Sequence, residues 1–347
     1  MNNGLTPQGA KRAFRIGNRT LSMIVLLLIA NAVVMILCTS LGSTMISPVN
    51  VVKALLGHGD AAASMIILKL RLPRVVIAIM IGSMLAVSGA VLQGIVRNPL
   101  TSPDVIGITG GAALGTVVFI LYFSHLSIRF MPVSSIIGAF GAALLIYLFA
   151  YRYGITPLRL VLIGIGMATA ITAVTYMLIL SAQFTPTAVA VKAFTFMTGS
   201  IYGASWERDV LTLLPWWAIL MPLAFMNARH LNVQALGDEV AIGVGSRVQF
   251  NRTMLLVISV ALAGSAAAIG GTIGFIGLMA PHIARKLVGP AYGGVLPVSA
   301  LTGSLVLMLA DLAARTAFNP LDIPAGVFTA AIGAPFFIYL IFRHRRA

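Results

Sequence analysis

The sequence predicts an all-α protein that crosses the membrane about ten times. Of its 347 residues 59% are hydrophobic and 9% are charged, and the mean hydropathy is +1.01. Apolar runs of about 20 residues recur along the chain, each enough to cross roughly 30 Å of hydrocarbon. Runs such as 21–41 are apolar on every face, whereas strands of a membrane barrel alternate apolar and polar residues. Lipid is therefore the main solvent for this chain.

Ten candidate spans follow from these runs. They cover residues 21–41, 75–96, 104–123, 132–151, 158–181, 208–227, 253–273, 274–288, 294–316 and 324–342. The eighth is too short to cross alone, and Gly and Pro crowd residues 270–281. We therefore expect the seventh and eighth to be a broken pair inside the bundle, where neighbouring helices satisfy the freed backbone groups. Residues 184–203 are expected to hold a short outer helix.

The N-terminal segment 1–20 is basic and is predicted to be cytoplasmic. Basic residues before an apolar run also occur in signal peptides, but the run 21–41 is long and lacks a convincing small-residue cleavage site. It is predicted to be an uncleaved first span. Residues 21–347 then form a single membrane domain.

Small residues line one face of the second and third spans. Gly107, Gly111 and Gly115 recur at four-residue spacing on the third. Such faces usually let helices pack closely where lipid removes the hydrophobic drive for association. A lining of a transport pathway is the alternative.

The segment 97–104 joins these two spans, and its two prolines predict a rigid, non-helical link. A rigid link can hold a gate, with Asn98 and Pro99 as candidates. An ordinary turn explains the same residues.

Three arginines are predicted on the outer side, against the usual charge bias. Arg71 and Arg74 precede the second span, and Arg315 follows Asp311 by one turn near the end of the ninth. They can be membrane anchors with a local Asp311–Arg315 pair. They can equally form a socket for acidic side chains of an extracytoplasmic partner.

A polar island at 229–252 interrupts the apolar chain and predicts a docking surface. It holds five charges, from Arg229, Asp238, Glu239, Arg247 and Arg252. Within it Gly237, Ala241 and Gly245 recur at four-residue spacing, so in a short helix they form one smooth face that another protein can approach.

The distribution of basic residues predicts the orientation. With the N-terminus inside and ten spans, inner segments carry 15 of the 23 basic residues. The positive-inside rule then places both termini and the island in the cytoplasm. The net charge of +15 is spread over loop ends instead of forming one basic stripe, so no nucleic-acid partner is predicted.

Catalytic and metal chemistry are not predicted. Cys38 is the single cysteine, the five histidines are scattered, and residues 270–282 lack the Gly-Lys-Ser/Thr ending of a phosphate-binding loop. No nucleophile, base and orienting group occur together. We expect no enzyme activity, no metal and no cofactor.

Six ordered motifs resemble the permease subunits of bacterial ATP-binding cassette (ABC) importers for iron-siderophores and vitamin B12, over about residues 46–342. They are Arg71-Leu72-Pro73-Arg74; Ser88-Gly89-Ala90 with Gln93; Asn98-Pro99-Leu100 with Pro103 and Gly107; Gly237-Asp238-Glu239 with Ala241 and Gly245; Gly274-Phe275-Ile276-Gly277-Leu278 with Pro281-His282; and Pro324 with Gly326-Val327 and Gly333-Ala334-Pro335.

The resemblance implies a type II importer permease fold with ten helices per subunit and a dimeric pore made by two copies or by a related chain. It implies two cytoplasmic ATPase subunits, an extracytoplasmic binding protein and a bacterial cytoplasmic membrane. By the same resemblance, residues 237–245 are the coupling helices, and Arg71, Arg74 and Arg315 receive acidic residues of the binding protein. Ferric siderophore is the expected cargo, with cobalamin and haem as alternatives.

Two positions depart from the family pattern. Small hydroxyl residues often open the fifth span there, but this chain has Thr156-Pro157-Leu158-Arg159, which puts gate chemistry at Thr156 and Pro157 in doubt. Val244 replaces a leucine of the coupling motif, a conservative change. A transporter of another class, driven by an ion gradient, requires a membrane-embedded carboxylate, and Asp311 is the candidate for it.

Overall fold

The computed structural model describes residues 17–42, 44–123, 125–151, 157–181, 187–318 and 322–344. Within these segments every regular element is a helix. Ten of the helices correspond to the ten expected spans. They are α2 (Asn18–Ser40), α5 (Leu72–Val96), α6 (Ile108–Tyr122), α7 (Met131–Tyr151), α8 (Pro157–Ser181), α10 (Leu211–Met226), α13 (Val248–Gly270), α14 (Ile276–Val288), α15 (Tyr292–Thr316) and α16 (Ala325–His344).

Seven helical stretches in the described part of the chain are long and apolar enough to cross a membrane, and α6 and α16 add shorter apolar helices. The third span begins at Ile108 and not at Asp104, because residues 98–107 form successive turns around Pro99 and Pro103. The predicted non-helical link is therefore confirmed and extends further than expected.

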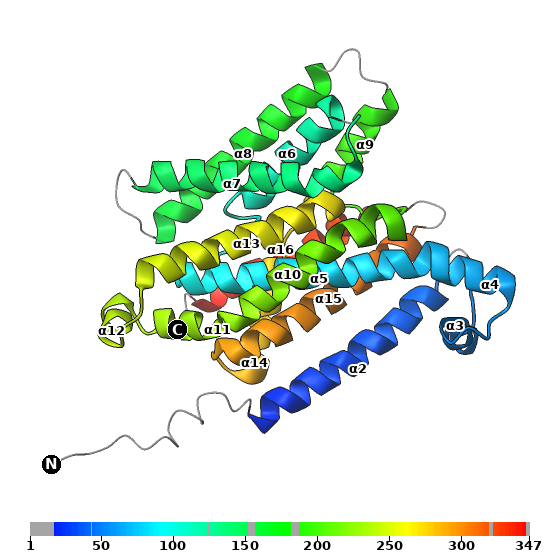
Figure 1. Ribbon diagram of the computed structural model, residues 1–347, viewed down its shortest axis with the longest axis horizontal. Helices are drawn as coiled ribbons and strands as arrows, with labels where there is room; N and C mark the ends of the chain where they lie inside the picture. The colour runs from blue at the N-terminus through cyan, green and yellow to red at the C-terminus, as the bar shows by residue number, and fades with distance from the viewer. Residues whose placement is uncertain are drawn as a thin grey trace.

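Shorter helices connect the long ones. They are α3 (Pro48–Leu55), α4 (Ala61–Met65), η1 (Ile66–Arg71), η2 (Ile128–Phe130), α9 (Thr187–Met197), η3 (Trp206–Val210), α11 (Ala228–Ala235) and α12 (Asp238–Gly243). Figure 1 places α3 and α4 at one end of the bundle and α11 and α12 at the opposite end. The helix α9 confirms the short helix expected in 184–203. We call the two ends the α3 end and the α12 end.

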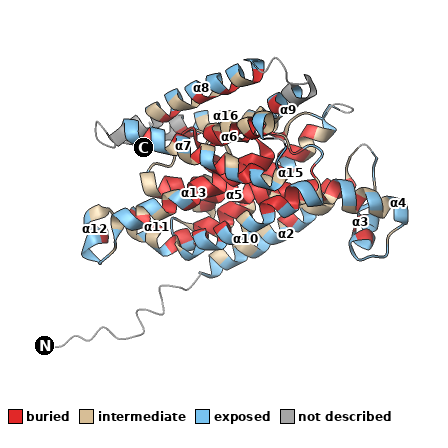
Figure 2. Ribbon diagram, turned by 45° about the horizontal axis from the view of Figure 1, so that its top comes forward, coloured by how far each residue is buried: buried red, intermediate tan, exposed pale blue. Residues whose placement is uncertain are grey.

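The helix α5 forms the centre of the bundle. It packs against α13, α14 and α15. In the most apolar stretch of this span, 89% of the residues are buried inside the protein. Figure 2 shows the buried residues concentrated along α5, α13 and α15. The helix α2 lies at the edge, and 6% of the residues in its most apolar stretch are buried. The helices α6, α7, α8 and α9 form a group on the other side of α13 (Figure 1). Both α5 and α2 are apolar on every face, but α5 is surrounded by other helices and α2 is mostly exposed to lipid.

Close helix crossings in the bundle depend on glycine. A Cβ atom at Gly82 would lie 2.4 Å from the Gly303 carbonyl oxygen, and one at Gly89 would lie 1.9 Å from the Gly277 carbonyl oxygen. These contacts join α5 to α15 and to α14. On α6, Gly111 and Gly115 meet α7, which confirms their packing role, whereas Gly107 precedes the helix in a left-handed conformation.

Two neighbouring glycines of α6 provide a test of this packing. We expect Gly111→Ala to lower the yield and thermal stability of the purified protein, because its Cβ would lie 2.4 Å from Ala142 Cβ and 2.5 Å from the Gly138 carbonyl oxygen. Gly110→Ala should be tolerated, since its nearest neighbour is 3.9 Å away. Equal melting temperatures for the two variants would show that α6 and α7 can separate without cost.

The seventh and eighth spans are a broken pair, as expected. The helix α13 ends at Gly270, five residues intervene, and α14 begins at Ile276. Because Gly277 packs against Gly89 in the second half of α5, α14 starts within the bundle and does not cross it. From there it runs toward the α12 end, where Tyr292 lies beside Gly94.

Candidate functional site

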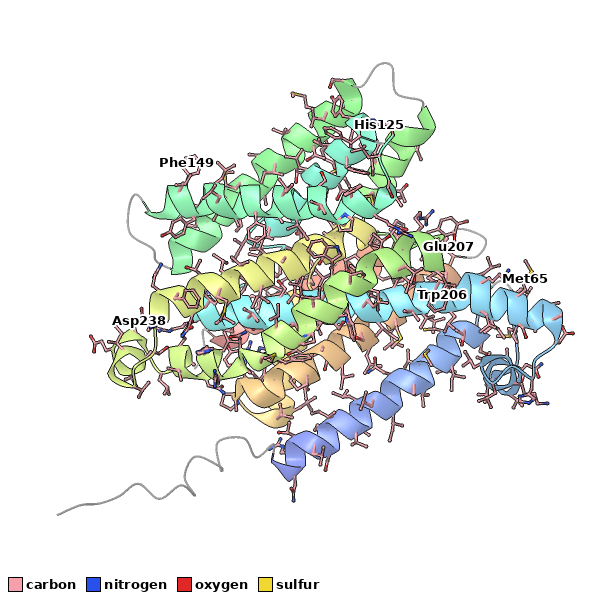
Figure 3. The ribbon with its side chains drawn as sticks, in the orientation of Figure 1. Met65, His125, Phe149, Trp206, Glu207 and Asp238 are labelled. Carbon is pink, nitrogen blue, oxygen red and sulfur yellow. The ribbon has the colours of Figure 1, made fainter. Side chains whose placement is uncertain are left out.

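The turn around α12 is tied to two long helices through one carboxylate. Asp238 is the first residue of α12 and accepts hydrogen bonds from Arg252 of α13, at 2.8 and 3.0 Å, and from Arg97 at the end of α5. Arg97 also donates to the Gln234 carbonyl oxygen at 2.8 Å. Figure 3 shows Asp238 at one end of the bundle, with Trp206 and Glu207 at the other. The six-residue helix α12 therefore has a fixed position relative to α5 and α13.

The arginines also set the charge state of Asp238. Burial raises the pKa of this carboxyl, but the hydrogen bonds from Arg252 and Arg97 outweigh that effect and hold the pKa below its usual range. The stabilisation is present at neutral pH and is lost as the pH falls through the lowered pKa. The tether is thus fully formed at neutral pH.

Apolar side chains cover the free surface of this turn. Leu236, Val240, Ile242 and Val244 are exposed around α12, and Phe250 is exposed at the start of α13. A groove of about 510 Å³ lies beside Ile242 and Phe250, and it is lined by Asp238, Ile242, Arg247, Val248, Gln249, Phe250 and Arg252. Exposed apolar residues beside charged ones are typical of a protein interaction site.

The smooth face predicted for this turn is not the exposed one. Ala241 has no exposed surface, so it faces the protein itself, while Gly237 and Gly245 are open. The surface that a partner can contact is formed instead by Val240, Ile242 and Val244. The expectation that the three residues share one helix face is wrong, because Gly237 and Gly245 lie on either side of α12 with positive φ and only Ala241 lies in the helix. Glu239 is exposed on the same turn.

A second cluster joins α5 to α14. Gln93 is buried, its amide nitrogen donates to the Gly277 carbonyl oxygen at 3.2 Å, and its amide oxygen accepts from Arg285. Sequence patterns gave no signal for Arg285 as the partner of Gln93. The buried Gln93 amide and the half-buried Arg285 guanidinium lie near the α12 end, where α14 ends.

The other predicted gate residues lie in two different segments, the link after α5 and the start of α8. Asn98 accepts from the Leu100 amide at 2.9 Å, which stabilises the turn at Pro99. Thr156 lies outside the described residues. Pro157 begins α8, and its side chain lies outside the described part. Gln93 thus lies on α5 and Asn98 and Pro99 lie directly after it, and a gate role for these residues and for Thr156 and Pro157 stays a prediction.

Asp104, which the sequence placed in an inner loop, makes a contact that connects distant helices. Its carboxylate accepts from the Phe275 amide at 3.0 Å, at the start of α14. The residues are 171 positions apart, and sequence spacing contains no signal for this contact.

Arg74 lies in a buried ion-pair cluster at the α3 end. Its Nε donates to the two oxygens of Asp311, at 2.9 and 3.1 Å, and its terminal nitrogens bind Asp322 at 2.6 and 2.9 Å. The ring of Tyr202 lies 5.8 Å from the guanidinium carbon. Asp322 was not predicted as a partner, because 248 residues separate it from Arg74.

The other two predicted docking arginines are also held internally. Arg71 is buried and donates to the carbonyl oxygens of Thr39, Ser40 and Thr44 at 2.6 to 2.9 Å. Arg315 donates to the Cys38 carbonyl oxygen, and its Nε lies 3.8 Å from Asp311. Direct contact of these three arginines with an external partner stays a prediction, and it would require displacement of internal acceptors.

Asp311 was the candidate for ion coupling. Its side chain is 2% exposed and is held by Arg74, with Arg315 one turn away. A carboxylate in such a cluster has a structural role, because it neutralises a buried guanidinium. The local pair expected from spacing is the weaker of its two contacts.

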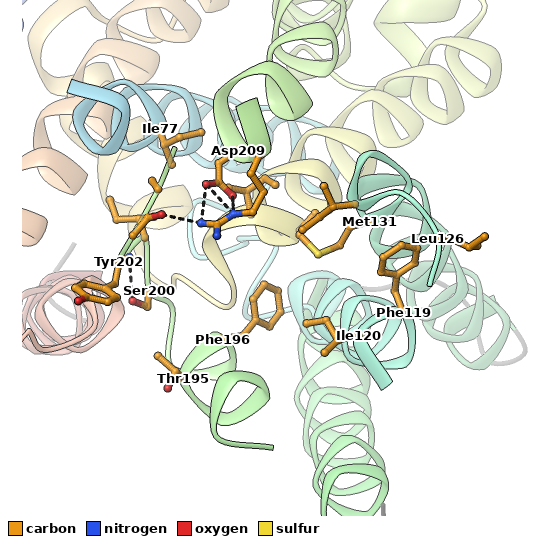
Figure 4. A pocket seen from close by; sticks show the side chains of 17 residues that line it. Ile77, Phe119, Ile120, Leu126, Met131, Thr195, Phe196, Ser200, Tyr202 and Asp209 are labelled. Atoms are coloured by element: carbon orange, nitrogen blue, oxygen red, sulfur yellow. Dashed lines mark hydrogen bonds and ion pairs between the residues drawn. The ribbon is translucent and has the colours of Figure 1, made fainter. Parts of the chain in front are cut away.

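A hollow of about 620 Å³ opens toward the α3 end. It is lined by Ile77, Phe119, Ile120, Leu126, Ile128, Met131, Thr195, Phe196, Ser200, Ile201, Tyr202, Gly203, Ala204, Arg208, Asp209, Ala268 and Ile269. Figure 4 shows its mostly apolar lining, with Asp209 bonded to the neighbouring arginine. That arginine, Arg208, is held by Asp209 at 2.9 Å and by the Gly203 carbonyl oxygen at 2.7 Å. The charge of Arg208 is thus balanced by Asp209 within the protein.

Comparison with known proteins gives a consistent result. The model of the FecCD transport family matches residues 26–343. A probable siderophore transport system permease protein of Bacillus subtilis is 45% identical, over 91% of this chain and 93% of the relative. The achromobactin transport system permease protein of Dickeya dadantii is 44% identical over 94% and 93%. An Fe(3+)-citrate import system permease protein of Bacillus subtilis is 41% identical over 95% and 98%.

Solved structures agree with the sequence matches. A metal-chelate type ABC transporter in an inward-facing conformation superposes with a TM-score of 0.79 at 28% identity, over 93% of this chain and 99% of the other. A second structure, of a complex from Streptococcus pneumoniae bound to a Fab, has a TM-score of 0.58 at 17% identity and shares the fold alone.

Proposed function

Because the chain belongs to the FecCD transport family, we propose that it is the membrane-spanning permease of an ABC importer that carries a ferric siderophore or a related iron chelate. The observation that carries the proposal is the similarity of nearly the whole chain to permeases named for siderophore and ferric citrate transport. The helical bundle, which matches a metal-chelate type ABC transporter, supports the same function.

The chain is a transport subunit of a larger assembly and not an enzyme. Membership of a permease family means that another subunit hydrolyses the ATP. We place residues 21–347 in one membrane domain, because α5 packs against helices from both halves of the chain.

The α12 turn is the proposed contact with two cytoplasmic ATPase subunits. Its exposed apolar residues and the groove beside Phe250 support this role, since a separate motor needs a surface to push against. The hydrogen bonds from Arg97 and Arg252 to Asp238 would transmit the movement of the ATPase to α5 and α13. In this proposal Gly237, Asp238, Glu239, Ala241 and Gly245 position the turn, while Val240 and Ile242 contact the motor.

We propose that the α12 end lies in the cytoplasm of a bacterial cell and that the protein lies in the cytoplasmic membrane. The start of α2 and the end of α16 lie at the same end as α12 (Figure 1), so both chain ends would be cytoplasmic. The excess of basic residues expected at this end supports that orientation.

A second permease subunit, the same chain or a related one, is proposed to complete the pore. Exposed apolar residues on α8 and α16 support this, because a helix face without neighbours within the chain is covered by lipid or by another subunit. Leu162, Ile165 and Met177 are exposed on α8, as are Ile332 and Ile338 on α16. The proposed path between two subunits needs no strong polar binding site, because the cargo must leave each step.

An extracytoplasmic binding protein is proposed to dock at the α3 end. The arginines Arg71, Arg74 and Arg315 lie there, which supports the role that the family resemblance implies for them. Because Asp322 occupies the outer edge of the Arg74 guanidinium, a partner carboxylate would have to replace it.

Uptake measurements test the function. Cells that lack this chain should import less radiolabelled ferric hydroxamate, ferric citrate or other ferric siderophore under iron limitation, and a plasmid copy should restore import. ATP depletion with an intact proton gradient should stop import, whereas a gradient-driven transporter would continue. Labelled cobalamin and haem are measured in parallel. Unchanged iron uptake with a loss of cobalamin or haem uptake would overturn the iron assignment.

A further inference from the structure

The link between α5 and α6 contacts the broken helix pair through Asp104 and Pro103. Asp104 Oδ2 accepts from the Phe275 amide at 3.0 Å, and Pro103 lies beside Gly277, the second residue of α14. Asp104 forms no ion pair with any described residue. The start of a helix carries partial positive charge, so the carboxylate is stabilised there without a basic partner.

Phe275 has an unfavourable backbone conformation. Its φ is 67°, and in the described part of the chain only one other non-glycine residue, Arg97, has a positive φ. A side chain with a Cβ rarely adopts this region unless its surroundings impose it. The hydrogen bond from the Phe275 amide to Asp104 is one such restraint, because it fixes the peptide at the point where the chain turns into α14.

The side chain of Phe275 fills a gap that only glycine leaves open. A Cβ atom at Gly333 of α16 would lie 2.2 Å from the Phe275 Cβ and Cγ atoms. The left-handed turn therefore places the Phe275 side chain directly on the α16 backbone. Rotation of this turn would remove that contact.

On its other side, the link packs against α8. A Cβ at Gly164 would lie 2.9 Å from Ile106 Cα, and one at Gly107 would lie 3.3 Å from Ala168 Cα. One continuous series of contacts thus runs from α8 through residues 104–107 and Phe275 to α16. Both helices have exposed apolar residues, and Figure 2 shows both in the upper part of the bundle.

We propose that Asp104 and Phe275 form a strut that makes α8 and α16 move together during transport. Asp104 is a positioning residue: it holds Phe275 in the left-handed conformation, and Phe275 transmits displacement between the link and α16. The inference rests on the proposed function for its part in transport, but the mechanical connection between α8 and α16 is a property of this chain alone.

The connection is measured first without any substrate. Spin labels are placed at Leu162→Cys on α8 and Ile338→Cys on α16, both exposed positions, and the native Cys38 is buried. The full chain is reconstituted in lipid nanodiscs, with labelled subunits diluted in unlabelled ones so that only distances within one chain are recorded. Asp104→Ala should broaden the distance distribution, and Asp104→Asn, which keeps an acceptor oxygen, should broaden it less.

Thr101→Val is the matched control in the same link. The Thr101 hydroxyl is buried and has no hydrogen-bond partner, so its loss removes no contact to α14. This variant should keep the narrow distribution of the wild type. A distribution in Asp104→Ala as narrow as that of the control would overturn the strut, whatever the cargo of the transporter.

Import of radiolabelled ferric citrate and ferric hydroxamate then tests the part of the strut in transport. Uptake per folded permease should fall by about tenfold in Asp104→Ala, the factor that loss of a charge-assisted hydrogen bond typically carries. Uptake by Phe275→Gly should fall equally, because glycine tolerates a positive φ but has no side chain to contact α16. Wild-type uptake in both variants would overturn the strut. Absence of uptake in the wild type would instead reject the proposed cargo, while the distance measurement still decides the strut.

Discussion

Asp238→Ala should lower ATP-driven import by about tenfold or more while leaving the permease folded in the membrane. The Asp238 carboxylate is the common acceptor of Arg97 and Arg252, so its loss frees α12 from both α5 and α13. A six-residue helix is not stable by itself and depends on such contacts for its position. Exposed ion pairs contribute only about 0 to 1 kcal/mol each, so the free energy of unfolding should change little.

The measurement is uptake per permease, with the protein quantified in purified membranes. We expect a loss of about tenfold or more, since displacement of a coupling surface that costs ~1.4 kcal/mol already corresponds to tenfold. Asp238→Asn keeps an acceptor oxygen and should retain part of the activity. Asp60→Ala, which removes the cap of α4 at the opposite end, is the control and should import normally. Normal import by Asp238→Ala would remove α12 as the coupling element.

Arg74→Ala should have the largest effect on stability. It leaves Asp311, whose side chain is 2% exposed, without its main cationic partner. Removal of one member of a buried pair typically costs about 3 to 5 kcal/mol, because the remaining charge stays desolvated. Asp322, with 23% of its side chain exposed, can be solvated when its partner is lost. Asp322→Ala should therefore lower the melting temperature much less than Asp311→Ala does.

The double variant Arg74→Ala/Asp311→Ala separates charge from packing. It removes both buried charges, so the purified protein should melt at a higher temperature than Arg74→Ala alone. The experiment is a thermal melt of each variant in the same detergent. If the double variant is less stable than Arg74→Ala, the side chains act through packing, and the ion-pair account of this cluster is wrong.

The spans could be predicted because hydropathy is a local property. Residues 21–41 are apolar without reference to any neighbour, and α2 begins and ends within three residues of that prediction. The break between the seventh and eighth spans is equally local, because α13 ends at the pair Gly270 and Gly271. The family motifs predicted the function, but they did not predict which side chains contact one another.

The contacts of the sites could not be predicted in the same way. Spacing suggested that Asp311 pairs with Arg315 one turn away, whereas Arg74, 237 residues distant, is its main partner. Ala241 was expected on an outward face and is buried. In each case the deciding factor is the rotation and register of one helix against another, and no short-range pattern contains that information.

The sequence by itself therefore determined the solvent of this protein, the number of its membrane helices and the turn that carries charge. Only the tertiary structure decided that Asp238 joins two helices, that Asp322 completes the Arg74 cluster and that Asp104 reaches Phe275. The physical reason is that apolar segments enter lipid one at a time, while ion pairs and glycine crossings form only after the helices have packed together.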